Sequence, residues 1–138
     1  MANFTTESAV RLKFQVEDTV HVSSALIAGS IDGAHGEILG LLDAGVDTEQ
    51  PGENLVLGET LLAGAHLLAS LASRNSASRA PVTVGGQRID GGKHFAPLMA
   101  LASRAEREAW RTLAPYLSAR PGAAPGGATD TLPVLGGG

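Results

Sequence analysis

The chain has 138 residues and a formal net charge of −4, and 43 % of its residues are hydrophobic, a composition typical of one soluble globular domain. Cysteine is absent, which excludes disulfide bonds and thiolate chemistry, and the acidic balance argues against a general nucleic-acid-binding protein. No apolar stretch approaches the roughly 20 residues needed to cross a bilayer, and the first residues lack the basic and apolar regions of a secretory signal. We therefore expect a cytoplasmic protein without a membrane-spanning segment.

The charges divide unevenly along the chain. Residues 1–69 carry ten acidic and two basic side chains, for a net charge of −8, whereas residues 70–138 carry four acidic and eight basic ones, for +4. Opposite patches of this kind could attract neighbouring copies head to tail. Folding can equally mix the two halves on one surface, so both interpretations stay open.

Helical periodicity predicts the first two helices. Thr5 and Thr6, followed by Glu7, can cap a short helix over about 6–13. Asp18 can cap a long helix over about 19–44, whose inward stripe is predicted to consist of Val20, Ile27, Ile31, Ala34, Ile38 and Leu42.

Two further helices are predicted in the second half. The helix over about 54–74 is rich in Leu and Ala, so we expect it to be the most buried one. The last helix, within about 93–114, should begin near Phe95, because Pro97 is tolerated only in a first turn. Pro115 ends or kinks it.

Residues 81–90, between these two helices, predict a β-hairpin in which β-branched residues flank a Gly-Gly turn. Two short strands alone are marginally stable in water, so the hairpin is expected to lie against a helix, another strand or another subunit. Its predicted interface residues are Val82, Val84, Gly85, Gly86 and Ile89. The expected fold is mainly α: a small bundle of about four helices with this hairpin, over residues 1–120, followed by an extended C-terminal arm over 121–138.

Four glycines of the long second helix, Gly29, Gly33, Gly36 and Gly40, recur at steps of four, three and four residues. At about 100° per residue they share one face, opposite the isoleucines. Each interior glycine costs up to about 1 kcal/mol against alanine, so such a face is easier to understand if another subunit packs closely on it. The alternative is a break near residues 30–33 that leaves the glycines at helix ends.

The C-terminal arm, residues 121–138, contains six glycines and three prolines and almost no charge. A segment of this composition cannot bury enough of its own surface to offset the entropy of ordering. Its only sizeable apolar residues, Leu132, Val134 and Leu135, fit a groove on another subunit.

Motifs of catalysis or cofactor binding are not found. The four histidines form no His-x-x-x-His pair, so we predict no metal site, and His66 is expected to be partly buried with a backbone or carboxylate partner. The glycine runs lack the Gly-Lys-Ser/Thr ending of a phosphate-binding loop, and no Gly-x-Ser-x-Gly elbow is present. We expect a protein that is not an enzyme and that needs no cofactor.

The order of elements resembles the head–tail connector (adaptor, or head-completion) proteins of tailed bacteriophages over about residues 4–118. The resemblance is carried by the apolar spacing Ile31, Ala34, Ile38 and Leu42, by the Val-Thr-Val-Gly-Gly-Gln-Arg-Ile hairpin, and by a closing helix with Ala109-Trp110, Leu113, Pro115 and Leu117. These motifs are patterns of spacing and order with no invariant chemical residue, and the Gly/Pro-rich arm departs from the family.

This resemblance implies a homo-oligomeric ring, usually twelve-fold, in the neck of the virion, assembled in the host cytoplasm. The ring would bind the portal protein, offer a platform for the tail or its terminator, and let DNA pass without sequence-specific binding. In that family the C-terminal segment commonly reaches into the portal. Acidic residues facing the channel would repel the phosphates of DNA. The alternatives are a tail-terminator or other neck ring protein, and a non-viral helical interaction module.

Overall fold

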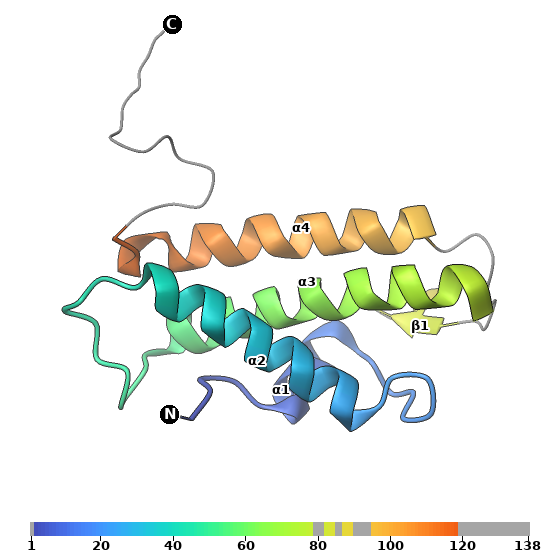
Figure 1. Cartoon of the computed structure of the whole chain (residues 1–138), viewed down its shortest axis with the longest axis horizontal. Coiled ribbons are helices and arrows are strands. Elements are labelled where there is room, and N and C mark those ends of the chain that lie inside the picture. Colours follow the sequence, from blue (N-terminus) through green and yellow to red (C-terminus); the bar gives the residue numbers. More distant parts are fainter. Residues whose placement is uncertain (1, 79–81, 85–86, 90–94, 119–138) are drawn as a thin grey trace, which may run out of the picture.

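The computed structural model describes residues 2–78, 82–84, 87–89 and 95–118, and side chains within residues 2–74 and 95–118. Its helices are α1 (Glu7–Phe14), α2 (Ser24–Leu41), α3 (Glu53–Ser78) and α4 (Phe95–Leu113), and a 3₁₀ turn covers Ala114–Tyr116. The strands β1 (Val82–Val84) and β2 (Gln87–Ile89) lie between α3 and α4 in the sequence. In Figure 1, α3 and α4 lie side by side along the long axis, and α2 crosses in front of α3 with α1 behind it.

The core forms around α3, which contacts all three other helices. Val10 of α1 and Leu98 and Leu113 of α4 are fully buried against it. The prediction that the Leu/Ala-rich helix is the most buried is confirmed. The completely buried large apolar side chains of the described residues are Val10, Val22, Ile27, Ile38, Leu62, Leu67, Leu68, Leu71, Leu98 and Leu113, with Val16 almost so.

The predicted start of α2 is wrong by about five residues. Asp18 does not cap the helix; its carboxylate accepts hydrogen bonds from the backbone N–H groups of Val20 and His21 and closes a turn. Ser23 is the N-cap, because its hydroxyl accepts from Leu26 N at 3.1 Å. Val20, predicted to face the core, lies in the preceding loop and is 82 % exposed.

The helices α2 and α4 end close together. Leu42 forms an antiparallel bridge with Leu117, and the N–H of Ser118 donates to the carbonyl of Leu41 at 2.8 Å. The end of α2 is thus set at Leu42, which has extended backbone angles, and the predicted continuation to residue 44 does not occur.

The predicted fold class needs a correction, because it made a β-hairpin a component of the fold. All regular secondary structure in residues 2–74 and 95–118 is helical, and the chain belongs to the α class. The two strands that the structure describes pair antiparallel over only three residue pairs, from Val82↔Ile89 to Val84↔Gln87. A ladder this short is too small to form a layer of its own.

The apolar stretch in α3 is longer than the sequence analysis allowed. Residues Glu53–Arg74 are long and apolar enough to cross a membrane by length and composition alone, but 72 % of the most apolar window is buried inside the protein. This degree of burial is typical of the core helix of a bundle.

Candidate interaction surface

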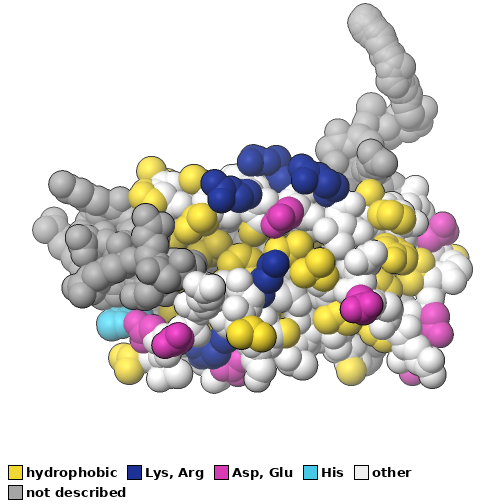
Figure 2. Space-filling view, turned by 180° about the vertical axis from the view of Figure 1, so that it is seen from behind, with side chains coloured by type: hydrophobic (Ala, Val, Ile, Leu, Met, Phe, Trp, Pro, Cys, Tyr) yellow, Lys and Arg dark blue, Asp and Glu magenta, His cyan; other side chains and the backbone are white. Residues whose placement is uncertain are grey.

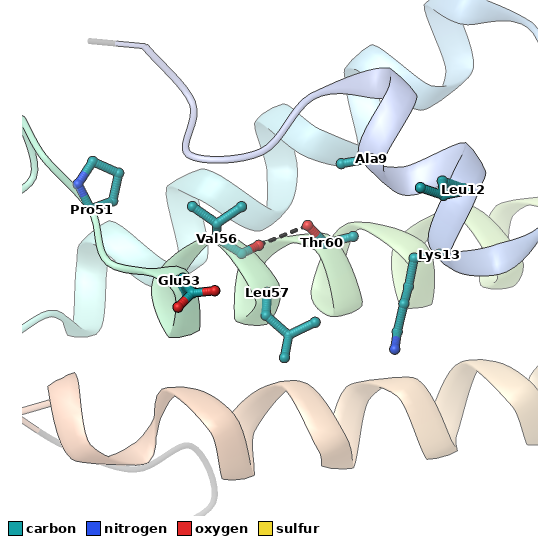
Figure 3. Close-up of a pocket in the computed structure, with 8 residues that line it drawn as sticks. All are labelled: Ala9, Leu12, Lys13, Pro51, Glu53, Val56, Leu57 and Thr60. Carbon is teal, nitrogen blue, oxygen red and sulfur yellow. Dashed lines mark hydrogen bonds between the residues drawn. The ribbon is translucent and has the colours of Figure 1, made fainter.

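An open groove between α1 and α3 has a mainly apolar lining. Its volume is about 630 Å³, and Leu12 of α1 and Leu57 of α3 are 80 % and 37 % exposed in it. Figure 3 shows Glu53 and Lys13 toward opposite ends of the groove. The groove is lined by Ala9, Leu12, Lys13, Pro51, Glu53, Val56, Leu57 and Thr60.

The sequence analysis did not single out this groove. Val10 and Phe14 of α1 turn toward α3, so Leu12, two residues from each, points away from that contact. Leu57 lies two residues after the buried Leu55, so it points away from the core side of α3. The sequence signal that could have indicated the groove is a large apolar residue that does not fall on the inward-facing stripe of its helix.

Charged side chains gather in two places: on the outer face of α4, and in an acidic connection that meets the groove at Glu53. Arg104, Arg107 and Arg111 are exposed and lie at steps of three and four residues on α4, so they share its outer face, which also carries the exposed Glu108. Figure 2 shows Lys and Arg side chains along the edge of the molecule that α4 forms. The loop between α2 and α3 is acidic: Asp43, Asp47, Glu49 and the following Glu53 are all exposed.

The four glycines predicted to share a face do lie together on the exposed side of α2. The helix is continuous over Ser24–Leu41, so the alternative of a break near residues 30–33 is wrong. A Cβ atom added at Gly29, Gly36 or Gly40 would meet nothing within 4 Å, and one at Gly33 would meet only the ring of His66 at 3.7 Å. No backbone of the described chain packs against this face, and close packing by a neighbouring copy stays a prediction.

Close packing on glycine occurs instead in α3, where the sequence analysis did not expect it. A Cβ atom at Gly64 would overlap the ring of Phe14, and one at Gly58 would overlap the side chain of Leu113. These two glycines allow α1 and α4 to approach α3.

The remaining predicted contact residues cannot be placed. Gly85, Gly86 and the arm residues Leu132, Val134 and Leu135 lie outside the described residues. The side chains of Val82, Val84 and Ile89 also lie outside the described part, and only their backbone is placed.

The described histidines pair with carboxylates. His66 Nε2 lies 2.6 Å from Glu37 Oε2, and the His66 side chain is 35 % exposed, which confirms the prediction of a partly buried histidine with a carboxylate partner. Within the described residues no group of three or more His, Asp and Glu side chains could hold a metal ion.

Glu59 is fully buried, and its partners come from two other parts of the chain. His35 Nδ1 lies 2.6 Å from Glu59 Oε1, and the backbone N–H groups of Phe4 and Thr5 donate to Oε2 at 2.7 and 2.9 Å. The ring of Phe4 packs edge-on against His35 with centroids 4.7 Å apart. This arrangement fastens the N-terminal segment to α2 and α3, and its burial keeps it from any ligand in solution.

Thr60 adds to the same anchor, because its hydroxyl lies 2.6 Å from that of Thr5. Glu59 and its histidine partner are 24 positions apart in the sequence and lie on different helices. That partner, His35, is on α2, which only the packing of α2 on α3 could reveal.

Comparison of the chain with known families, curated proteins and solved structures finds no match to any of them.

Proposed function

We propose that this protein is a structural subunit that assembles with copies of itself and with other proteins. The observation that carries the proposal is the apolar groove between α1 and α3, where Leu12 is 80 % exposed and Leu57 is 37 % exposed in the same concave surface. Each Å² of apolar surface left in water costs about 25 cal/mol, and a concentration of such surface commonly marks a contact site.

The charge distribution supports a head-to-tail contact. Arg104, Arg107 and Arg111 lie on α4. The acidic residues at 43, 47 and 49 lie in the connection between α2 and α3, and Glu53 begins α3. Two different surfaces that attract each other form a heterologous interface, which closes into a ring when the rotation between copies permits it.

The finer proposal is that the ring is the connector between portal and tail of a tailed bacteriophage. Its support is the resemblance in element order and apolar spacing described above, together with a helical bundle. The alternative of a tail terminator is less favoured, because those folds typically rest on a substantial β-sheet and the described strands have three residues each.

The ring would extend the DNA channel, with acidic side chains turned toward the phosphates so that the duplex slides through. It would offer the tail a docking platform, and the C-terminal arm would contribute to docking on the portal or on adjacent subunits. No catalytic step and no cofactor belong to this proposal.

The experiment is a mass measurement of the purified protein, by native mass spectrometry and sedimentation, with and without the portal protein of the same virus. We expect a ring of copies, bound to portal, that dissociates as salt is raised because exposed charges are screened. Leu12→Ser should weaken assembly at least tenfold, whereas Val20→Ser, an equally exposed apolar residue outside the groove, should not.

A monomer under all these conditions would contradict the structural-subunit proposal as a whole. An oligomer that ignores the portal would leave self-assembly in place and contradict the connector role alone.

A further inference from the structure

We propose that the groove between α1 and α3 of one copy receives residues 130–135 of a neighbouring copy. This inference rests on the self-assembly proposed above and names the contact through which it occurs. Three features carry it: the apolar character of groove and segment, the position of Asp130 relative to Lys13, and the point at which the arm leaves the domain.

The apolar match is the first feature. Within residues 119–138 the sizeable apolar side chains are Leu132, Val134 and Leu135, all within four positions. Pro133 favours an extended backbone before it, and an extended segment would place Leu132 and Val134 on one side, roughly 7 Å apart. The groove offers two apolar walls to such a pair, one from Leu12 on α1 and one from the α3 residues 56 and 57.

Charge gives the segment a direction in the groove. Asp130 precedes the apolar residues by two positions, and the exposed Lys13 lies toward one end of the groove, with Glu53 toward the other. Asp130 would therefore lie at the Lys13 end, and the reverse direction would bring it toward Glu53. An exposed pair of this kind contributes more to orientation than to affinity.

The arm leaves the domain beside the C-terminal end of α2, because the N–H of Ser118 is held by the carbonyl of Leu41. The groove, by contrast, lies between α1 and α3. The eleven residues from 119 to 129 can span at most about 36–40 Å, which exceeds the roughly 28 Å length of a 19-residue helix such as α4. The spacer is long enough to cross to an adjacent copy held head to tail.

Disulfide trapping tests the contact cleanly, because the chain has no cysteine of its own. We would mix the single variants Leu57→Cys and Leu132→Cys, oxidise mildly, and follow the linked dimer on non-reducing gels. The matched control mixes Val20→Cys, exposed but outside the groove, with Leu132→Cys. We expect the groove pair to link at least tenfold faster than the control pair.

A second measurement covers the case in which cysteine at position 57 disturbs folding. The full-length variant with Leu132, Val134 and Leu135 all changed to Ser leaves the described domain intact, and we expect its self-association to weaken at least tenfold. Unchanged association would overturn the proposal.

Other outcomes separate this inference from the proposed function. Equal linking of both pairs, or linking within one chain in the double variant Leu57→Cys/Leu132→Cys without linking between chains, would overturn the arm-in-groove contact. If rings still form in that case, the structural-subunit proposal stands. A protein that stays monomeric overturns both.

Discussion

Glu59 shows how a single buried residue connects three parts of this chain. A carboxylate removed from water loses several kcal/mol of hydration free energy, which must be offset by partners of good geometry. Here the offset comes from His35 and two backbone N–H groups, all within 3.0 Å. Loss of these partners would leave the N-terminal segment without its principal polar anchor.

We predict that Glu59→Ala lowers the free energy of unfolding by about 3–5 kcal/mol, the range for removing one partner of a buried pair. Glu59→Gln should cost less, because an amide oxygen can still accept from Phe4 and Thr5. Urea denaturation followed by circular dichroism measures both, with Glu53→Ala, exposed on the same helix, as the control. A cost below 1 kcal/mol for Glu59→Ala would contradict this account.

Two carboxylates at the junction of α1 and α2 link stability to pH. Hydrogen bonds from Ser24 and Arg11 hold the pKa of Glu7 below its ordinary value of 4.5, and the backbone N–H of His21 is the main cause that lowers the pKa of Asp18. A pKa that is lower in the folded than in the unfolded protein stabilises the fold above the unfolded value. That contribution is lost as pH falls through the folded value.

We therefore expect the free energy of unfolding to fall as pH drops below about 4.5, toward 3. Glu7→Gln should make this part of the curve flatter, and Glu49→Gln, in an exposed loop, serves as the control. Denaturant midpoints measured at several pH values between about 6 and 3 test the prediction. A Glu7→Gln curve parallel to that of the parent protein would contradict it.

At the scale of the elements, a helix with two candidate N-caps begins at the one that the surrounding tertiary contacts favour. The sequence offers Asp18 and Ser23 as caps for α2, and the residues between them are held by Arg11, whose guanidinium donates to the carbonyl of Val22 at 2.8 Å. This tertiary contact favours a loop over residues 18–22, so the helix starts at the second cap.

Glycines divide into two classes by the space around them. In α3 a glycine allows a neighbouring side chain to approach, whereas on the outer face of α2 three of the four glycines have open space around them within the chain. Spacing along the sequence cannot separate the classes, because both lie inside helices and the difference is the presence of a neighbour.

We predict opposite effects of alanine in the two classes. Gly64→Ala should destabilise the fold by about 1–3 kcal/mol because the added methyl overlaps Phe14. Gly36→Ala should stabilise the monomer by up to about 1 kcal/mol through helix propensity. Thermal and urea unfolding measure both, and the reverse order of stabilities would contradict the packing described here.

The same α2 variants also test the predicted glycine interface. If a neighbouring copy packs on this face, alanine at Gly33 and Gly36 will weaken assembly while it stabilises the monomer. A stabilised protein that assembles normally would exclude close packing there.

At the scale of the whole molecule, the fold buries most of the large apolar side chains and leaves the groove between α1 and α3 as a remainder, besides single exposed residues such as Val20 and Phe95. The helices bury their inward stripes around α3, and the groove beside α1 stays open, with the arginines of α4 elsewhere on the surface. The function proposed for the protein depends on this remainder, because an assembling subunit needs surface that its own core does not use.

Periodicity alone was sufficient to predict the four helices and most of their buried residues, because the apolar stripe of a helix must face a core whatever the neighbouring element is. The sequence analysis also predicted a backbone or carboxylate partner for His66, and Glu37 is that partner. The start of α2, the burial of Glu59 with His35, and the α1–α3 groove depended on which helix faces which. These features were decided by tertiary structure, because each one arises where side chains distant in sequence meet or fail to meet.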